Sequence, residues 1–156
     1  MRRYDRLIFV SNSDTAVGPM AEAILQSKYL QDELAITSKG VVVLFPEPIN
    51  PKAEAVLVSN GLTMKEHMSD PLVREDFGER TLILATSESV KQKVLNEIAP
   101  EDAQVRTLHE YVGEEQEVTN PYGGALADYG QCFAQLEALI TKLVVQLNEQ
   151  ELLSEE

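Results

Sequence analysis

The chain opens with an apolar run, Leu7 to Val10, that is typical of a buried parallel strand. A small polar loop, Ser11 to Gly18, follows this run. Pro19 suits the first turn of a helix because its φ angle is already helical. The next apolar positions recur at helical spacing as far as Leu30; they are Met20, Ala21, Ile24, Leu25 and Tyr29. The opening of the chain therefore predicts a strand, a loop and a helix.

The same alternation continues along the rest of the chain. The further predicted strands are Leu34–Thr37, Thr81–Ala85 and Val105–Leu108. The further predicted helices are Pro51–Asn60, which is closed by Gly61, and Ser87–Ile98. Loops are predicted at Gly40–Asn50 and Tyr111–Gly124. Strands that alternate with helices predict an α/β fold with a parallel sheet.

A long final helix is predicted after Gly124. Its apolar positions form one stripe that we expect to face the core: Leu126, Tyr129, Phe133, Leu136, Ile140, Leu143 and Leu147. Cys132 lies in this helix, and we expect a packed thiol rather than a reactive one. Residues 148–156 are predicted to form an acidic, frayed tail.

Together these elements predict one α/β domain over residues 1–156, in three layers (α/β/α), with a four-stranded parallel sheet covered by helices on both faces. In such sheets ligands bind at the carboxyl ends of the strands. The loop Ser11–Gly18 leaves the first strand and leads to a helix N-terminus, which favours anions. We therefore expect any chemistry to be located at this loop.

The charge and the cysteine count limit the classes of partner and cofactor. The formal net charge is −13, from 13 basic and 26 acidic residues, which argues against nucleic acid and anionic membranes as partners. One cysteine without a Cys/His ligand spacing predicts no disulfide, metal or cofactor, and points to a reducing compartment. The first apolar run is too short for a signal peptide or a membrane span, so we expect a cytoplasmic protein.

Several motifs, in this order and spacing, resemble the low-molecular-weight protein-tyrosine phosphatases over about residues 5–147. The motifs that carry the resemblance are Leu7-Ile8-Phe9-Val10, Pro19-Met20-Ala21-Glu22-Ala23, Ser38-Lys39-Gly40, Glu47-Pro48-Ile49-Asn50-Pro51-Lys52-Ala53, Asn60-Gly61-Leu62 with His67, Asp76-Phe77 before Leu82-Ile83-Leu84-Ala85, and Asn120-Pro121-Tyr122-Gly123-Gly124. The resemblance implies a catalytic loop immediately before Pro19, in which a cysteine attacks phosphorus and an arginine binds the phosphoryl oxygens. It also implies an aspartate that protonates the leaving group.

This chain departs from the family pattern at each of those catalytic positions. Ser11 occupies the nucleophile position, Val17 the arginine position and Gly18 the Ser/Thr position that follows it, and Asn120 occupies the acid position. A serine needs an adjacent base to become a nucleophile. Valine offers neither charge nor donors for phosphate, and asparagine cannot donate a proton as an acid does. The sequence therefore predicts a pseudophosphatase with a protein-binding or regulatory role, its partner a protein or another copy of the chain.

The remaining loop residues leave two interpretations open. Asn12, Ser13, Asp14, Thr15, Ala16 and Gly18 are candidate binding residues, and they equally suit a solvated turn with nothing bound. We expect the charge of Asp14 to repel phosphate. Phe45 and Tyr122 are candidate rim contacts, while His67 and His109 are expected to be structural or surface residues. The alternative function is an enzyme with a remodelled site or weak residual phosphomonoester hydrolysis.

Overall fold

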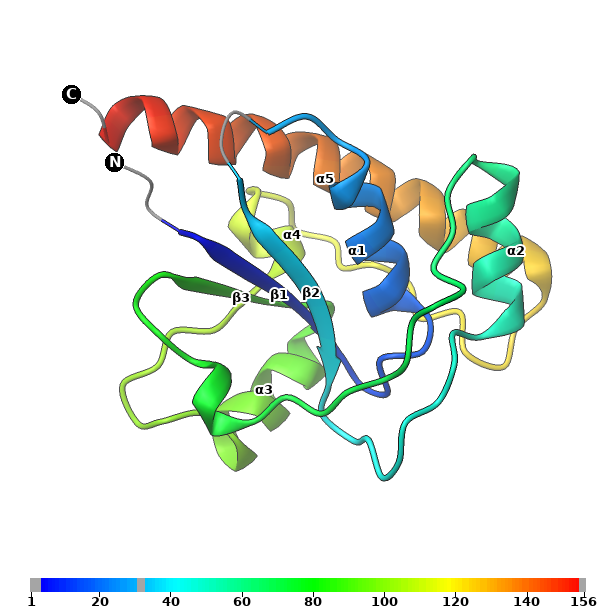
Figure 1. Ribbon diagram of the computed structural model, residues 1–156, viewed down its shortest axis with the longest axis horizontal. Helices are drawn as coiled ribbons and strands as arrows, with labels where there is room; N and C mark the ends of the chain where they lie inside the picture. Colours follow the sequence, from blue (N-terminus) through cyan, green and yellow to red (C-terminus); the bar gives the residue numbers. More distant parts are fainter. Residues whose placement is uncertain (1–3, 31–32, 155–156) are drawn as a thin grey trace.

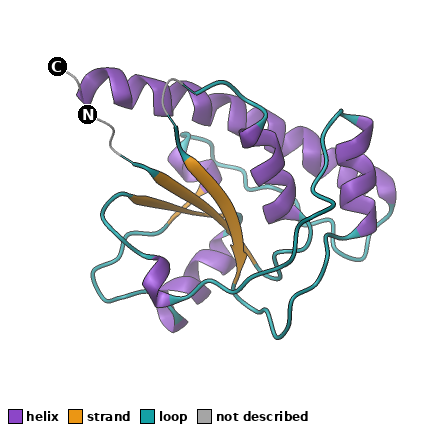
Figure 2. Cartoon of the chain, viewed as in Figure 1, coloured by secondary structure: helices purple, strands orange, loops and turns teal. Residues whose placement is uncertain are grey.

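A computed structural model describes residues 4–30 and 33–154, with the backbone alone described for residues 150–154. The strands are β1 (Arg6–Ser11), β2 (Ala35–Gly40), β3 (Thr81–Ala85) and β4 (Arg106–Thr107). The helices are α1 (Val17–Gln26), α2 (Pro51–Ser59), the 3₁₀ helix η1 (Arg74–Asp76), α3 (Glu88–Glu97), α4 (Leu108–Tyr111) and α5 (Leu126–Ser154). Figure 1 shows their arrangement along the chain, and Figure 2 shows how helices surround the sheet.

The four strands form one parallel sheet in the order β2-β1-β3-β4. Leu7 of β1 lies opposite Ile36 of β2 on one side and Leu82 of β3 on the other. The chain moves from β1 to β2 in one direction and then crosses back to β3 on the other side of β1. This reversal creates a crevice at the carboxyl ends of β1 and β3, where open α/β sheets bind ligands. The predicted fold class is confirmed.

Alternate residues of the central strands supply two apolar clusters, one on each face of the sheet. Leu7 and Phe9 belong to the larger cluster, which includes residues of α1, α2, α4 and α5. Ile8 and Val10 point to the opposite face and belong to the cluster that includes α3. The residues between Arg6 and Ser11 are therefore apolar without alternation because both faces of the strand are covered.

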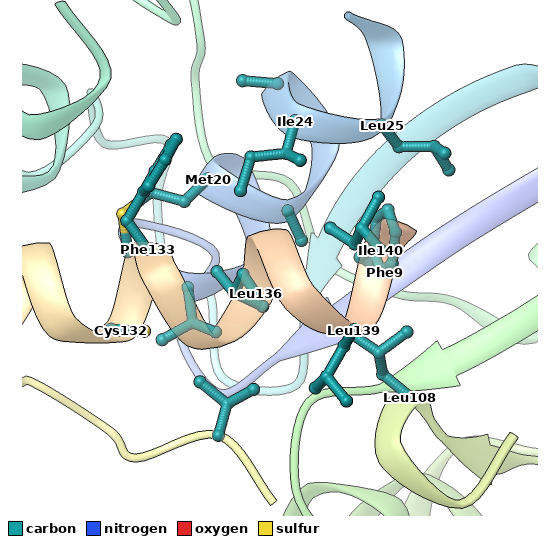
Figure 3. Packing of buried hydrophobic residues seen from close by; sticks show 14 of the residues in the cluster. Phe9, Met20, Ile24, Leu25, Leu108, Cys132, Phe133, Leu136, Leu139 and Ile140 are labelled. Atoms are coloured by element: carbon teal, nitrogen blue, oxygen red, sulfur yellow. The ribbon is translucent and has the colours of Figure 1, made fainter. Parts of the chain in front are cut away.

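Helix α5 covers the larger cluster along its length. Its predicted stripe is buried at Tyr129, Phe133, Leu136, Ile140, Leu143 and Leu147. Figure 3 shows Leu136 and Ile140 of α5 in the cluster that also holds Phe9 of β1 and Met20 and Ile24 of α1. Leu126 is the exception, with 53% of its surface exposed, because it lies in the first turn of the helix, outside the packed segment.

Helix α1 begins earlier and ends earlier than predicted. It starts at Val17, inside the predicted loop, because the Met20 amide already donates to the Ala16 carbonyl at 3.0 Å. Pro19 is compatible with this start since first-turn amides have no helical partner. Ser27 ends the helix, its hydroxyl donating to the Ile24 carbonyl at 2.6 Å. Tyr29, predicted to be on the apolar face, lies beyond the helix and is 82% exposed.

The other differences concern short or terminal segments. Strand β2 runs past Thr37 to Gly40, and β4 is limited to two residues, so Val105 is buried without belonging to a strand. Helices η1 and α4 were not predicted. The predicted tail of residues 148–156 is helical as far as Ser154, and residues 155–156 lie outside the described part.

Candidate functional site

A pocket of about 400 Å³ lies at the carboxyl ends of β1 and β3. Three segments form it: the loop between β1 and α1, the start of α3, and the segment before α5. Its lining residues are Ser11, Asn12, Ser13, Thr15, Ala16, Val17, Thr86, Ser87, Ser89, Val90, Lys93, Val118, Asn120 and Tyr122. The pocket thus brings together the three positions that the resemblance matches to the catalytic groups, together with Tyr122 and four of the other candidate loop residues.

Ser11 is the last residue of β1, lines this pocket and is 6% exposed. Its hydroxyl oxygen accepts a hydrogen bond from the Asp14 amide at 3.1 Å. Among the hydrogen bonds of the described residues, none joins the Ser11 hydroxyl to a histidine or a carboxylate. A serine without such a base remains a weak nucleophile near neutral pH.

Val17 and Asn120 provide no charge at the positions where the family pattern has an arginine and an acid. Val17 is the first residue of α1; it lines the pocket and also belongs to the larger apolar cluster. The Asn120 side-chain oxygen accepts a hydrogen bond from the Tyr122 amide at 3.1 Å. This local turn orders the segment before α5 and uses the acceptor of the amide group.

Asp14 does not line the pocket, and the structure corrects the expectation of a solvated turn for it. The residue is fully buried, with φ at 59°, a left-handed conformation that aspartate tolerates better than most residues. Its carboxylate is directed beneath the loop, where Oδ2 accepts from the Asp70 amide at 3.0 Å. Asp14 is therefore not part of a solvated turn, while the repulsion of phosphate by its charge stays a prediction.

Gly18 also lies beneath the loop rather than in the pocket. A β-carbon at Gly18 would be 2.9 Å from Ser11 Oγ and 3.3 Å from Asp14 Oδ1. Glycine therefore allows these two side chains to approach the first turn of α1 closely. The inward turn of Asp14 and the absence of a side chain at Gly18 belong to the same local packing arrangement.

His67 is a structural residue in this arrangement, as expected. Its Nε2 lies 2.7 Å from the Asp14 carbonyl oxygen, which can only accept, so Nε2 carries the proton. The same nitrogen lies 3.6 Å from Asp14 Oδ2. Burial raises the pKa of the Asp14 carboxyl to about 6, although Ser38, His67 and the Asp70 amide favour its charged form. Burial also raises the pKa of Glu22, which lies near the same cluster on α1. His109 is buried beside Thr107, at a distance of 3.5 Å, which agrees with a structural role.

Sequence reasoning missed the contribution of α3 to the pocket. Ser87 and Ser89 add hydroxyl groups, and Lys93 adds the only formal charge among the lining residues that the structure describes. Lys93 Nζ donates to the Asn12 side-chain oxygen at 3.0 Å. The sequence contains a signal for this contribution. Thr86 and Ser87 follow directly after a predicted strand, and the carboxyl ends of parallel strands lie at one edge of the sheet.

Phe45 and Tyr122 are both exposed but differ in their relation to the pocket. Tyr122 lines it and is 82% exposed, so this ring forms part of its mouth. Phe45 is 63% exposed and lies outside the lining, in a loop that also exposes Val42 and Leu44. In the described part of the chain no three His, Cys, Asp or Glu side chains are placed to hold a metal ion. No described helix has the length and apolar character needed to cross a membrane.

The fold is a four-stranded parallel α/β sheet whose pocket lies at the loop after β1. The family model described as low molecular weight phosphotyrosine protein phosphatase matches residues 6–153. The chain therefore belongs to the low-molecular-weight phosphotyrosine protein phosphatase family.

Individual relatives include proteins named for two different substrates. A protein-arginine-phosphatase of Bacillus subtilis is 32% identical over 146 residues, covering 92% of this chain and 97% of that protein. The crystal structure of a low-molecular-weight protein tyrosine phosphatase from T. tengcongensis is 33% identical, with a TM-score of 0.83 over 90% of this chain and 98% of that one. A YwlE arginine phosphatase variant, in which serine replaces cysteine and the active-site serine is phosphorylated, is 32% identical, with a TM-score of 0.80 over 91% and 95% of the two chains.

Proposed function

We propose that this protein is a catalytically inactive member of its family, a pseudophosphatase that binds a protein partner or a second copy of itself through the pocket and its rim. The observation that carries the proposal is the composition of the pocket. No cysteine, histidine, arginine or carboxyl side chain is among its lining residues in the described part of the chain. Phosphomonoester hydrolysis requires a nucleophile, a stabilised phosphoryl group and a protonated leaving group.

Among the described residues, the groups that usually meet these three requirements in the family do not line this pocket. The Ser11 hydroxyl has no base, and His67, the histidine that contacts the loop, is bonded to the Asp14 carbonyl instead. Loss of a general acid alone typically lowers a rate by about 10²–10⁴. Lys93 carries a positive charge, but it is an exposed side chain bonded to Asn12. These losses act on one transition state and need not multiply, yet each is large by itself.

The first experiment is hydrolysis of p-nitrophenyl phosphate, a phosphotyrosine peptide and a phosphoarginine peptide by the purified chain. We expect no turnover beyond that of the Ser11→Ala variant, which serves as the matched control. The triple variant Ser11→Cys, Val17→Arg, Asn120→Asp tests whether the loop still adopts a phosphate-binding shape. Turnover by the natural chain that Ser11→Ala abolishes would contradict the proposal.

The binding role is tested by self-association and by partner capture. Sedimentation measures self-association of the natural chain and of the Tyr122→Ala and Phe45→Ala variants. Co-purification from the native cell measures partner capture by the same three proteins. Tyr29→Ala is the control, because Tyr29 is 82% exposed like Tyr122 and lies at the other end of α1 from the pocket. We expect association to be weakened at the rim and unchanged in the control. A monomer without a stoichiometric partner would argue strongly against a binding role.

A second candidate function, a remodelled site with residual phosphoryl chemistry, is favoured by one relative. In the YwlE variant a serine at the active site carries a phosphoryl group. Ser11 occupies the matching position, so it is a candidate phosphoryl acceptor with slow hydrolysis. Intact-mass analysis after incubation with phosphoarginine or phosphotyrosine peptide measures this directly. A mass increase of one phosphoryl group, absent in Ser11→Ala, would favour this candidate, and an unchanged mass would exclude it.

A further inference from the structure

Residues 11–16 form the loop that lines the pocket. One buried residue of this loop, Asp14, holds it in place through hydrogen bonds. Its amide donates to Ser11 Oγ at 3.1 Å, and its carbonyl accepts from His67 at 2.7 Å. Its carboxylate accepts from the Asp70 amide at 3.0 Å. Through these contacts Asp14 connects the loop with residues 67–70, a segment that is distant in sequence.

Only one of the two oxygens of the Asp14 carboxylate accepts a hydrogen bond. Oδ1 is buried without a hydrogen-bond partner, and so is the hydroxyl of Ser38, which lies beside it at the end of β2. The Ser38 side chain lies next to Glu22 as well. A serine hydroxyl has one proton to donate, whereas two ionised carboxylates can only accept. With Asp14 and Glu22 both charged, this cluster therefore has fewer donors than its acceptors need.

We propose that Asp14 is a proton-controlled lock on the pocket loop: proton uptake by its carboxyl adds a hydrogen bond between residues 11–16 and Ser38 of β2, and proton loss removes it. A protonated Oδ1 becomes a donor that Ser38 Oγ can accept, while Oδ2 keeps its bond from the Asp70 amide. The idea that this lock regulates binding at the pocket rests on the proposed function. The proton uptake by Asp14 does not depend on that function.

Burial sets the direction of the effect, against most of the groups around Asp14. Ser38, His67 and the Asp70 amide favour its ionised form, and Glu22 on α1 opposes it. The Lys39 ammonium pairs with the Asp70 carboxylate. Desolvation is the largest of these influences and favours the neutral carboxyl, raising its pKa to about 6. The loop should therefore be held most firmly in mildly acidic solution.

Hydrogen exchange of the amides that are bonded to the loop, corrected for the intrinsic effect of pH, tests the lock. The Val42, Asn50 and Asp70 amides donate to Asn12, Thr15 and Asp14 of the loop. Between pH 5 and pH 7.5 we expect their protection to fall by at least about fivefold and by no more than about 100-fold, the ratio that two pKa units allow. Asp14→Asn is a neutral isostere whose amide can donate to Ser38, and it should show constant protection. Glu22→Gln is the matched control and should retain the dependence on pH.

The same samples identify which carboxyl carries the proton. The carboxyl carbon of Asp14 in the natural chain should titrate with a midpoint near pH 6, a measurement that remains valid if a variant fails to fold. Protection that does not change with pH, or a dependence that survives Asp14→Asn and disappears in Glu22→Gln, would overturn the proposal. Neither result would affect the case for catalytic inactivity, which depends on turnover.

Discussion

Replacing Asp14 by asparagine should stabilise the whole protein at neutral pH. The aspartate is fully buried, and its pKa is raised from 3.8 to about 6 in the folded state. A folded pKa above the unfolded value means that the stabilising contribution is complete below about pH 4 and is lost as the pH rises through about 6. Two pKa units correspond to about 3 kcal/mol, which is the penalty that the ionised carboxylate imposes above this window. Asparagine has no such penalty at any pH.

Urea unfolding followed by far-ultraviolet circular dichroism measures this difference, since the chain has no tryptophan to report by fluorescence. We expect Asp14→Asn to gain about 3 kcal/mol in the free energy of unfolding at pH 7.5, and about half of that at pH 5, because the carboxyl is then largely protonated in the folded state. With a slope of about 1–3 kcal/mol per molar urea, the gain at pH 7.5 moves the midpoint by at least about 1 M. A variant less stable than the natural chain at pH 7.5, or an equal gain at both pH values, would refute the reasoning.

Three further predictions concern other parts of the structure. Gly40→Ala would place a β-carbon 2.7 Å from Val43 Cγ2, so we expect the free energy of unfolding in urea to fall by about 1–3 kcal/mol. Adding Val43→Ala should restore part of this loss. An unchanged midpoint would contradict the expected clash, because it would show that the loop relaxes freely. Ser87 is the N-cap of α3, and its hydroxyl oxygen accepts from the Val90 amide at 3.2 Å. Ser87→Ala should therefore lower the free energy of unfolding by about 1 kcal/mol. Ser89→Ala, in the first turn of the helix, should lower it by less. Burial raises the pKa of Cys132 to about 12, so a thiol reagent at pH 8 should modify it only after unfolding, and rapid modification of the folded protein would contradict this burial.

The pocket shows how far site prediction from sequence extends. Ser11, Val17 and Asn120 were matched to their positions by motif order, and the structure gathers all three around one pocket. Asp14 was expected in a solvated turn because the direction of a loop side chain depends on the local backbone conformation, here with φ at 59°, which sequence pattern does not specify. Its partners His67 and Asp70 come from a segment distant in the chain, so their approach is a property of the folded chain alone.

Periodicity by itself determined the class of fold, since unbroken apolar runs such as Leu7 to Val10 require cover on both faces, and the stripe of α5 requires a core on one face. Residue identity alone determined that Ser11, Val17 and Asn120 stand at the positions that the resemblance matches to the catalytic groups. Only the tertiary structure decided that Ser87 and Lys93 join the pocket and that the carboxylate of Asp14 is buried outside it. The physical reason is that burial and charge proximity depend on distances in space, and a local pattern does not contain the contacts between segments that set them.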